Sequence, residues 1–193
     1  DSNIKLNIPN NKFVIMYTGN MGKSQNFESL IKTIRYFDDT KKILWIFVGN
    51  GRFKNRFINK LSTEKLEHNC LFIDQVDIQK IPSYSNYADA MFLSLNENKI
   101  FNNTLPAKLQ TYMALKKPII GVLKGEGERI ILESNSGIVE NKNDYLSLAK
   151  KIEKLLELKK NEIERFGTNG REYYEKKFNS KQRKIQLQKI IEL

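Results

Sequence analysis

The sequence has one cysteine, one histidine and no long apolar segment. Cys70 cannot form a disulfide within the chain, and its place before the apolar residues 71–73 indicates a buried, reduced thiol. With His68 as the only histidine, we expect neither a Ser/His/Asp triad nor a metal site, and we predict no cofactor and no metal. No segment approaches the roughly 20 apolar residues that span a bilayer, and no signal segment is recognisable, so we predict a cytoplasmic location.

Basic residues exceed acidic ones, with 33 lysines and arginines against 22 acids and a formal net charge of +11. A nucleic-acid partner would require a basic patch or a recognisable binding module. The lysines instead form scattered pairs among glutamates, which is typical of solvated helix faces, so we predict no nucleic-acid partner. The charge leaves open an attraction to an anionic substrate, or to anionic lipids at the inner face of the plasma membrane.

Short apolar segments alternate with segments of helical periodicity. The 193 residues, 40% of them hydrophobic, are enough for one domain with one substantial core. Residues 1–12 are polar and are predicted to be a linker, and from residue 143 onward only helical patterns occur. We predict an α/β fold that is Rossmann-like and doubly wound, with about six parallel strands, helices on both faces and a C-terminal helical tail. The predicted strands are residues 13–18, 43–48, 71–73, 90–93, 118–123 and 137–139.

A loop, a helix and a strand follow one another in residues 103–121. Pro106 stands where a helix can begin without losing a needed N–H group, and Pro118 opens the next strand. Lys108 is therefore expected in the first turn of a short helix whose N-terminus points out of the sheet. The free N–H groups and the dipole at such a helix end favour negative charge. This unit predicts a site for a phosphorylated ligand.

Glycine-containing turns follow three of the predicted strands, at residues 19–22, 49–52 and 125–129. Glycines allow the backbone to approach a ligand phosphate at the carboxyl edge of an open α/β sheet, and Glu126 or Glu128 could accept hydrogen bonds from sugar hydroxyls. Each turn also has a plainer explanation, as a tight connection or, for the glutamates, as acids stabilised by a helix dipole. A nicotinamide cofactor is disfavoured, because neither the three-glycine fingerprint nor an acidic residue after the second strand is found.

Eight motifs occur in an order that is more specific than any one of them. They are Gly19-Asn-Met-Gly22, Val48-Gly-Asn-Gly-Arg52, Phe72-Ile-Asp-Gln-Val76, Tyr87-Ala-Asp-Ala90, Thr104-Leu-Pro-Ala-Lys-Leu109, Ala114-Leu-Lys-Lys-Pro118, Gly125-Glu-Gly-Glu-Arg129 and Phe166-Gly-Thr-Asn-Gly-Arg171. This series resembles the C-terminal half of a GT-B glycosyltransferase of family 4, group 1. It is similar to the branch that builds bacterial surface polysaccharides such as capsule and lipopolysaccharide, N-acetyl-L-fucosamine transferases included.

The resemblance implies that residues 13–193 are the half that binds a nucleotide-sugar donor, here a UDP-sugar. A separate N-terminal half, absent from this chain, would bind a lipid-linked or oligosaccharide acceptor, and the isolated donor half would be inactive in transfer. The resemblance further implies a retaining, metal-independent reaction. It places the base near Ile73 to Val76 and the diphosphate near Gly19, Gly22, Lys108 and residues 125–127.

The chain departs from the family at two pairs of positions. Asn103 and Thr111 stand where the family has two glutamates, although Thr111 could still reach a ribose hydroxyl. Asn20 and Gln25 stand near the family's two basic residues. We therefore assign neutralisation of the phosphates, and with it the catalytic role, to Lys108 and Arg52. The predicted donor-binding residues are Gly19, Asn20, Gly22, Gly51, Ile73, Val76, Asn103, Thr104, Leu105, Thr111, Gly125, Glu126, Gly127 and Glu128.

Two alternative functions remain at this stage. A non-hydrolysing UDP-sugar epimerase shares the GT-B architecture, but it would need histidines and carboxylates in its cleft. A non-enzymatic, flavodoxin-like binding module would lack the helical tail after residue 139, and it would have an acidic cluster after the first strand.

Overall fold

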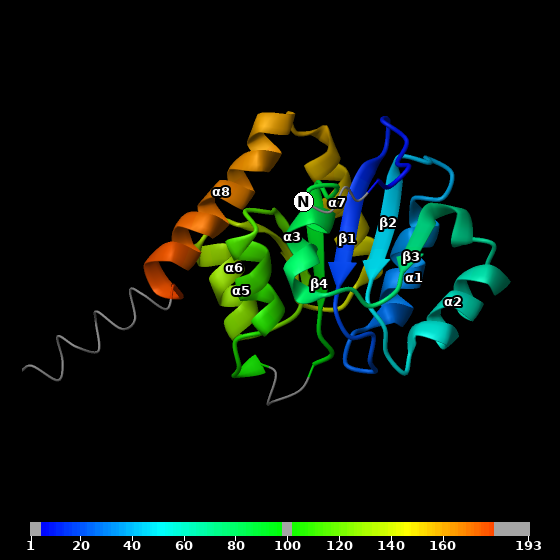
Figure 1. Ribbon diagram of the computed structural model, residues 1–193, viewed down its shortest axis with the longest axis horizontal. Coiled ribbons are helices and arrows are strands. Elements are labelled where there is room, and N and C mark those ends of the chain that lie inside the picture. The colour runs from blue at the N-terminus through cyan, green and yellow to red at the C-terminus, as the bar shows by residue number, and fades with distance from the viewer. Residues whose placement is uncertain (1–4, 98–101, 180–193) are drawn as a thin grey trace, which may run out of the picture.

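A six-stranded parallel sheet lies between two layers of helices in the computed structural model, which describes residues 5–97 and 102–179 (Figure 1). The strand order is β3-β2-β1-β4-β5-β6, so the chain starts in the middle, builds one half of the sheet and then returns to build the other. The predicted doubly wound α/β fold is confirmed. The strands are β1 Phe13–Thr18, β2 Ile43–Val48, β3 Cys70–Ile73, β4 Ala90–Ser94, β5 Ile119–Val122 and β6 Gly137–Glu140.

Strands β1 and β2 form the centre of the core because nearly all their side chains are apolar. All six residues of β2 are buried, as are five of the six residues of β1. Continuous apolar runs of this kind are typical of parallel strands that are covered on both faces. The two strands pair along their whole length, from Phe13 opposite Ile43 to Thr18 opposite Val48. Both strands therefore end at the same edge of the sheet, and the turns that follow them start side by side.

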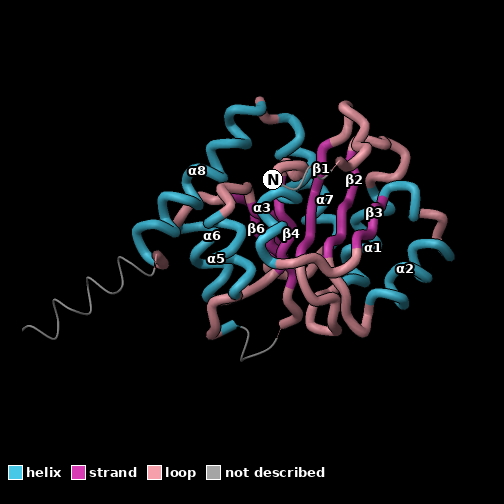
Figure 2. The backbone as a smooth tube through the Cα atoms, in the orientation of Figure 1, coloured by secondary structure: helices cyan, strands magenta, loops and turns pink. Residues whose placement is uncertain are grey.

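Helices cover both faces of the sheet (Figure 2). One face packs against α1, α2 and α7, and the other against α3, α5 and α6, with α8 lying along α5. Helices α1, α2, α5, α6 and α7 each bury apolar residues at helical spacing, whereas the short α3 contributes the partly buried Ile81 and Tyr84. The bounds are α1 Phe27–Tyr36, α2 Lys54–Thr63, α3 Ile81–Ser85, α5 Ala107–Ala114, α6 Glu126–Glu133, α7 Tyr145–Glu157 and α8 Lys160–Lys177.

The predicted helical tail is present as far as α8. Arg171 of α8 donates a hydrogen bond to the Ala114 carbonyl at the end of α5, and Asn169 donates to the Asn135 carbonyl at 3.0 Å. Carbonyls at helix ends have no partner within their own helix, so these two side chains satisfy groups that would otherwise need water. The predicted helix over residues 180–192 lies outside the described residues.

The predicted boundaries differ from the structure by a few residues. Strand β3 begins at Cys70, one residue early, and burial raises the pKa of this partly buried free thiol to about 12. Asp144, one of two predicted caps, accepts a hydrogen bond from the Leu146 N–H at the start of α7. Of the predicted linker, Leu6 and Ile8 pack against the core. Among the described helices, none combines the length and the apolar character that a membrane span requires.

Candidate functional site

A pocket of about 540 Å³ opens at the carboxyl edge of β1, β2 and β3. Its walls come from the turns after β1 and β2, from the segment between β3 and α3, and from α5. An edge of this kind is where open α/β sheets bind ligands. The lining residues are Thr18, Gly19, Asn20, Val48, Gly49, Asn50, Gly51, Gln75, Val76, Ile78, Ile81, Pro82, Lys108, Thr111, Tyr112 and Leu115.

The turns after β1 and β2 pack backbone against backbone, which only glycine permits. Gly49 has φ +144°, and a Cβ at this position would lie 2.1 Å from the Gly19 carbonyl oxygen. Hydrogen bonds join the same two turns, from the Met21 N–H to the Asn50 carbonyl at 2.8 Å and from the Phe53 N–H to the Met21 carbonyl at 3.0 Å. The two turns therefore form one rigid wall, in which Gly19, Gly49 and Gly51 border the pocket without a side chain and Asn20 and Asn50 also belong to the lining.

Among the described residues, Lys108 is the only lysine or arginine in the lining of this pocket. It is the second residue of α5, and its side chain crosses to β1, where Nζ lies 4.3 Å from the Tyr17 ring centroid and donates to the Tyr17 hydroxyl. Position 19 favours glycine, because its φ of +114° strains any other residue and a Cβ there would lie 2.8 Å from Lys108 Cε, which would have to shift. No carboxylate within residues 5–97 and 102–179 forms an ion pair with Lys108. Burial lowers the pKa of Lys108 to about 8, because a charged ammonium loses water there without gaining an anion.

Two buried tyrosines hold the end of β1 in place. The Tyr17 hydroxyl donates to the Asn20 carbonyl, and the Tyr112 hydroxyl of α5 accepts a hydrogen bond from the Thr18 N–H at 3.1 Å. Burial raises the pKa of Tyr17 far above its usual value and that of Tyr112 to about 12, so both phenols are neutral at physiological pH. Sequence reasoning took Tyr17 only as part of an apolar strand. A tyrosine near the end of a buried strand was the available signal, because its hydroxyl must find a partner.

The structure brings together some of the predicted site residues and not others. Those that line the pocket are Gly19, Asn20, Gly51, Val76, Lys108 and Thr111. Arg52, Asn103 and Thr104 lie on the surface, and Ile73 and Leu105 pack against the core. The Gly22 N–H is already bonded to the Gln25 side chain at 2.8 Å. The lining also includes Gln75, which lies within the stretch from Ile73 to Val76 predicted to border the base. Sequence reasoning missed Ile78, Ile81 and Leu115, because nothing in their types marks a ligand site.

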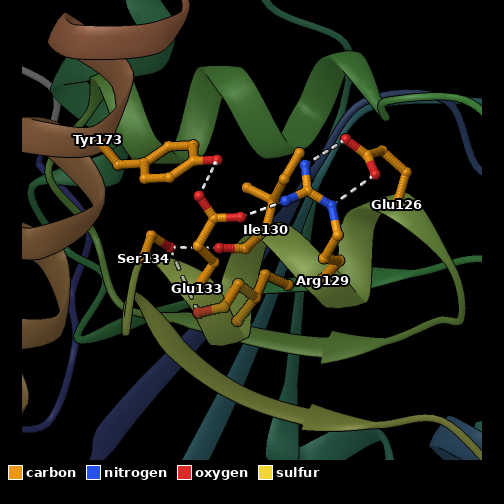
Figure 3. Close-up of polar contacts among 7 residues, drawn as sticks. Glu126, Arg129, Ile130, Glu133, Ser134 and Tyr173 are labelled. Atoms are coloured by element: carbon orange, nitrogen blue, oxygen red, sulfur yellow. Dashed lines mark hydrogen bonds and ion pairs between the residues drawn. The ribbon is translucent and has the colours of Figure 1, made fainter.

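The predicted donor residues from Gly125 to Glu128 begin α6, away from the pocket lining. Arg129 holds Glu126 through two hydrogen bonds of 2.7 and 2.8 Å, and it also binds Glu133, which accepts from Tyr173 of α8 (Figure 3). Glu128 accepts a hydrogen bond from Asn141 at 2.5 Å. Both acids therefore have protein partners, and their contacts favour the plainer explanation, that of carboxylates at a helix start.

The described residues include no group of three or more His, Cys, Asp or Glu side chains that could hold a metal ion. The chemistry of the pocket instead rests on one cation, the backbone of two glycine turns and an apolar wall. Such a set suits a ligand with a negatively charged part and a flat apolar part. The fold is that of the α/β domain that forms the C-terminal half of GT-B glycosyltransferases, and the pocket lies at the edge where open α/β sheets bind ligands.

Comparison with known proteins supports this class. The chain matches the family Glycosyl transferases group 1 over residues 1–173, and it belongs to that family. It is 26% identical over 111 residues to WcaI of Escherichia coli (strain K12), named as a colanic acid biosynthesis glycosyl transferase; the match covers 58% of this chain and 26% of WcaI. The family match favours a transferase over the epimerase and over the flavodoxin-like module.

Solved structures with the same fold include two that cover nearly all of the chain. Sucrose-phosphate synthase from Thermosynechococcus elongatus has a TM-score of 0.78 at 18% identity, covering 96% of this chain and 46% of that protein. HepE of Anabaena, solved in complex with UDP and glucose, has a TM-score of 0.77 at 15% identity, covering 94% of this chain and 48% of HepE. The chain thus spans about half of each solved protein and about a quarter of WcaI.

Proposed function

We propose that this chain is the donor-binding half of a glycosyltransferase that uses a nucleotide-sugar, with a UDP-sugar as the donor, in bacterial surface polysaccharide synthesis. The observation that carries the proposal is Lys108, a largely buried ammonium that lines the pocket without an ion-paired carboxylate among the described residues. Burying a cation is unfavourable unless a negative charge completes the site. Membership of the transferase family and the presence of UDP in HepE support a nucleoside diphosphate as the source of that charge.

The two kinds of pocket wall suggest how the donor lies. The diphosphate would lie beside Lys108 and the glycine turns, where the ammonium can donate to its oxygens. The N–H groups of Gly19, Gly49 and Gly51 already have acceptors within the protein, so the turns would contribute close approach rather than these donors. The base would lie against Val76 and Ile81, and the exposed hydroxyl of Thr111 could serve a ribose. Lys108 would then stabilise the leaving diphosphate as its charge develops during transfer. Arg52, on the surface next to the Gly51 turn, could add to this only if the donor extends toward it.

The remaining parts of the proposal concern the whole enzyme. Transfer would proceed with retention and without a metal, onto a lipid-linked or saccharide acceptor bound by a separate N-terminal half. The isolated chain should bind the donor but transfer hardly any sugar, because closure of the two halves is needed to exclude water. The excess of basic residues suits peripheral binding at the anionic inner face of the plasma membrane.

A titration of the purified chain with UDP, GDP, ADP and inorganic pyrophosphate tests the proposal. We expect UDP to bind more tightly than the other nucleotides, and we expect the Lys108→Met variant to lose most of this affinity. Lys150→Met, which removes an exposed lysine from α7, is the matched control and should bind as wild type does. If none of the four compounds binds to the wild-type chain, the proposed function is wrong.

A further inference from the structure

A second buried lysine lies just behind the pocket. Lys54 is the first residue of α2, and only 10% of its side chain is exposed. Its Nζ donates to Asp74 Oδ1 at 2.6 Å and to the Gly49 carbonyl at 3.2 Å. Lys54 does not line the pocket, yet both of its partners belong to segments that do. It is therefore placed to act on the site through them.

The two partners stand at the bases of two different pocket walls. Gly49 opens the rigid glycine wall after β2, while Asp74 directly precedes Gln75 and Val76, which form part of the apolar wall. The backbone joins the same segments through the Gly49 N–H and the Ile73 carbonyl at 2.9 Å. Past Ile73 the strand pairing of β2 and β3 has ended. Lys54 then continues the connection through side-chain contacts.

Lys54 and Asp74 differ in exposure, and this difference shows which of the two side chains is ordered by their contact. The Asp74 side chain is 88% exposed, and a carboxylate so exposed would ordinarily sample several rotamers in water. The Lys54 ammonium is fixed by its burial and by the Gly49 carbonyl, and a hydrogen bond between charged groups is stronger than one between neutral groups. The fixed partner is therefore the lysine, and the partner that it orders is Asp74 together with the backbone leading to Val76.

We infer that Lys54 is a positioning residue for the donor site, which holds the Gln75 and Val76 segment against the glycine wall and so fixes the gap in which the nucleoside lies. The inference rests on the proposed function, because it assigns the base to this gap. It adds a role for two residues that lie outside the pocket lining. Lys54 touches no ligand itself, and its effect on binding passes through Asp74 and Gly49.

Asp74 could affect UDP binding through its charge alone or by positioning the pocket wall, and the two roles predict opposite changes in UDP affinity when Asp74 is substituted. Removing its negative charge should strengthen binding of anionic UDP if only long-range charge matters, and should leave neutral uridine unaffected. If Asp74 positions the wall, Asp74→Ala should instead lower the affinities for UDP and for uridine by the same factor, about three- to tenfold. Asp74→Asn keeps an oxygen that can accept from Lys54, so it should recover part of the loss. Asp39→Asn, an exposed acid beyond the end of α1, controls for the change in charge.

Substitutions at Lys54 complete a double-mutant cycle with those at Asp74. Lys54→Met keeps the apolar stem and removes the ammonium, and it should lower uridine affinity by the same factor as Asp74→Ala. The double variant should bind uridine no more weakly than either single variant, because both changes break one contact. Lys60→Met is the control on the same helix, since it removes an equal charge from a side chain that is 58% exposed and does not line the pocket.

Isothermal titration of these variants with uridine and UDP, combined with amide hydrogen exchange on the free proteins, tests the inference. Exchange at the Gly49 amide, whose hydrogen bond to the Ile73 carbonyl joins the two segments, should accelerate several-fold in Lys54→Met and Asp74→Ala, and not in the controls, whether or not UDP binds. Equal exchange in all proteins, or stronger UDP binding by Asp74→Ala, overturns the positioning role. Failure of the wild type to bind UDP, with exchange accelerated as expected, would instead overturn the proposed function and leave only the ordering of this segment by Lys54 supported.

Discussion

Lys108→Met should make the free domain more stable and at the same time weaken its binding of UDP. Burial lowers the pKa of Lys108 from 10.5 to about 8, so the folded protein holds this proton less tightly than the unfolded chain does. A tenfold change in proton affinity corresponds to about 1.4 kcal/mol, which gives an upper limit of about 3 kcal/mol at neutral pH. Partial exposure and the lost contact with Tyr17 reduce this to about 1–2 kcal/mol.

The sign of the pH dependence follows from the same shift. The pKa of Lys108 is lower in the folded than in the unfolded chain. The destabilisation caused by the buried ammonium is therefore complete below about pH 8 and disappears as the pH rises toward 10.5. In urea unfolding, Lys108→Met should therefore have a higher free energy of unfolding than the wild type at pH 7, and the difference should be smaller at pH 10. Comparing the two proteins at each pH cancels titrations that they share.

Binding should change in the opposite direction. A charge-assisted contact to the diphosphate contributes roughly 1.5–3 kcal/mol, so Lys108→Met should weaken UDP binding about tenfold or more, with uridine nearly unaffected. Lys150→Met should change neither property. Lower stability of Lys108→Met at pH 7 would refute the view that the ammonium is buried at a cost. Unchanged UDP affinity would refute its role as the phosphate partner.

Three further predictions follow from the site. UDP affinity of the wild type should fall as the pH rises above about 8, because above that pH the free Lys108 must take up a proton to bind, whereas uridine affinity should stay constant. Titrations between pH 7 and about 8.8, where the uracil ring is still largely un-ionised, decide this, and a flat UDP profile would contradict it. Tyr112→Phe leaves the buried Thr18 N–H without this acceptor and should cost about 1–3 kcal/mol in urea unfolding, whereas an unchanged midpoint would show that another group takes over. EDTA should leave UDP affinity unchanged, and a clear loss would point to a bound metal.

The fold could be predicted from the sequence because its strands carry strong local signals. The β-branched and apolar runs of β1 and β2, each closed by glycine, leave little choice of element, and the alternation with helical segments leaves few topologies. Errors were confined to ends, such as β3, which begins at Cys70. These depend on backbone pairing with a neighbouring strand, which no local pattern reveals.

The site was predictable only where a residue type has a direct chemical reason to be there. Lys108 and the glycines at positions 19 and 51 could be found, because a cation at a helix start and glycine turns at strand ends are typical of phosphate sites. Ile81 could not, since an isoleucine that lines a pocket looks the same in sequence as one in the core. Lys54 was also missed, because its burial results from the packing of α2 against the end of β3.

Mapping UDP onto the chain by amide chemical shifts tests the central claim most directly. On titration, the largest shift changes should fall on Gly19, Gly51, Val76 and Lys108, which surround the pocket, and they should be much reduced in Lys108→Met. A second cavity lies between α1 and α2, lined among others by Arg35 and Arg56. Shift changes concentrated there, or none at saturating UDP, would contradict the assignment of the donor to the carboxyl edge of the sheet.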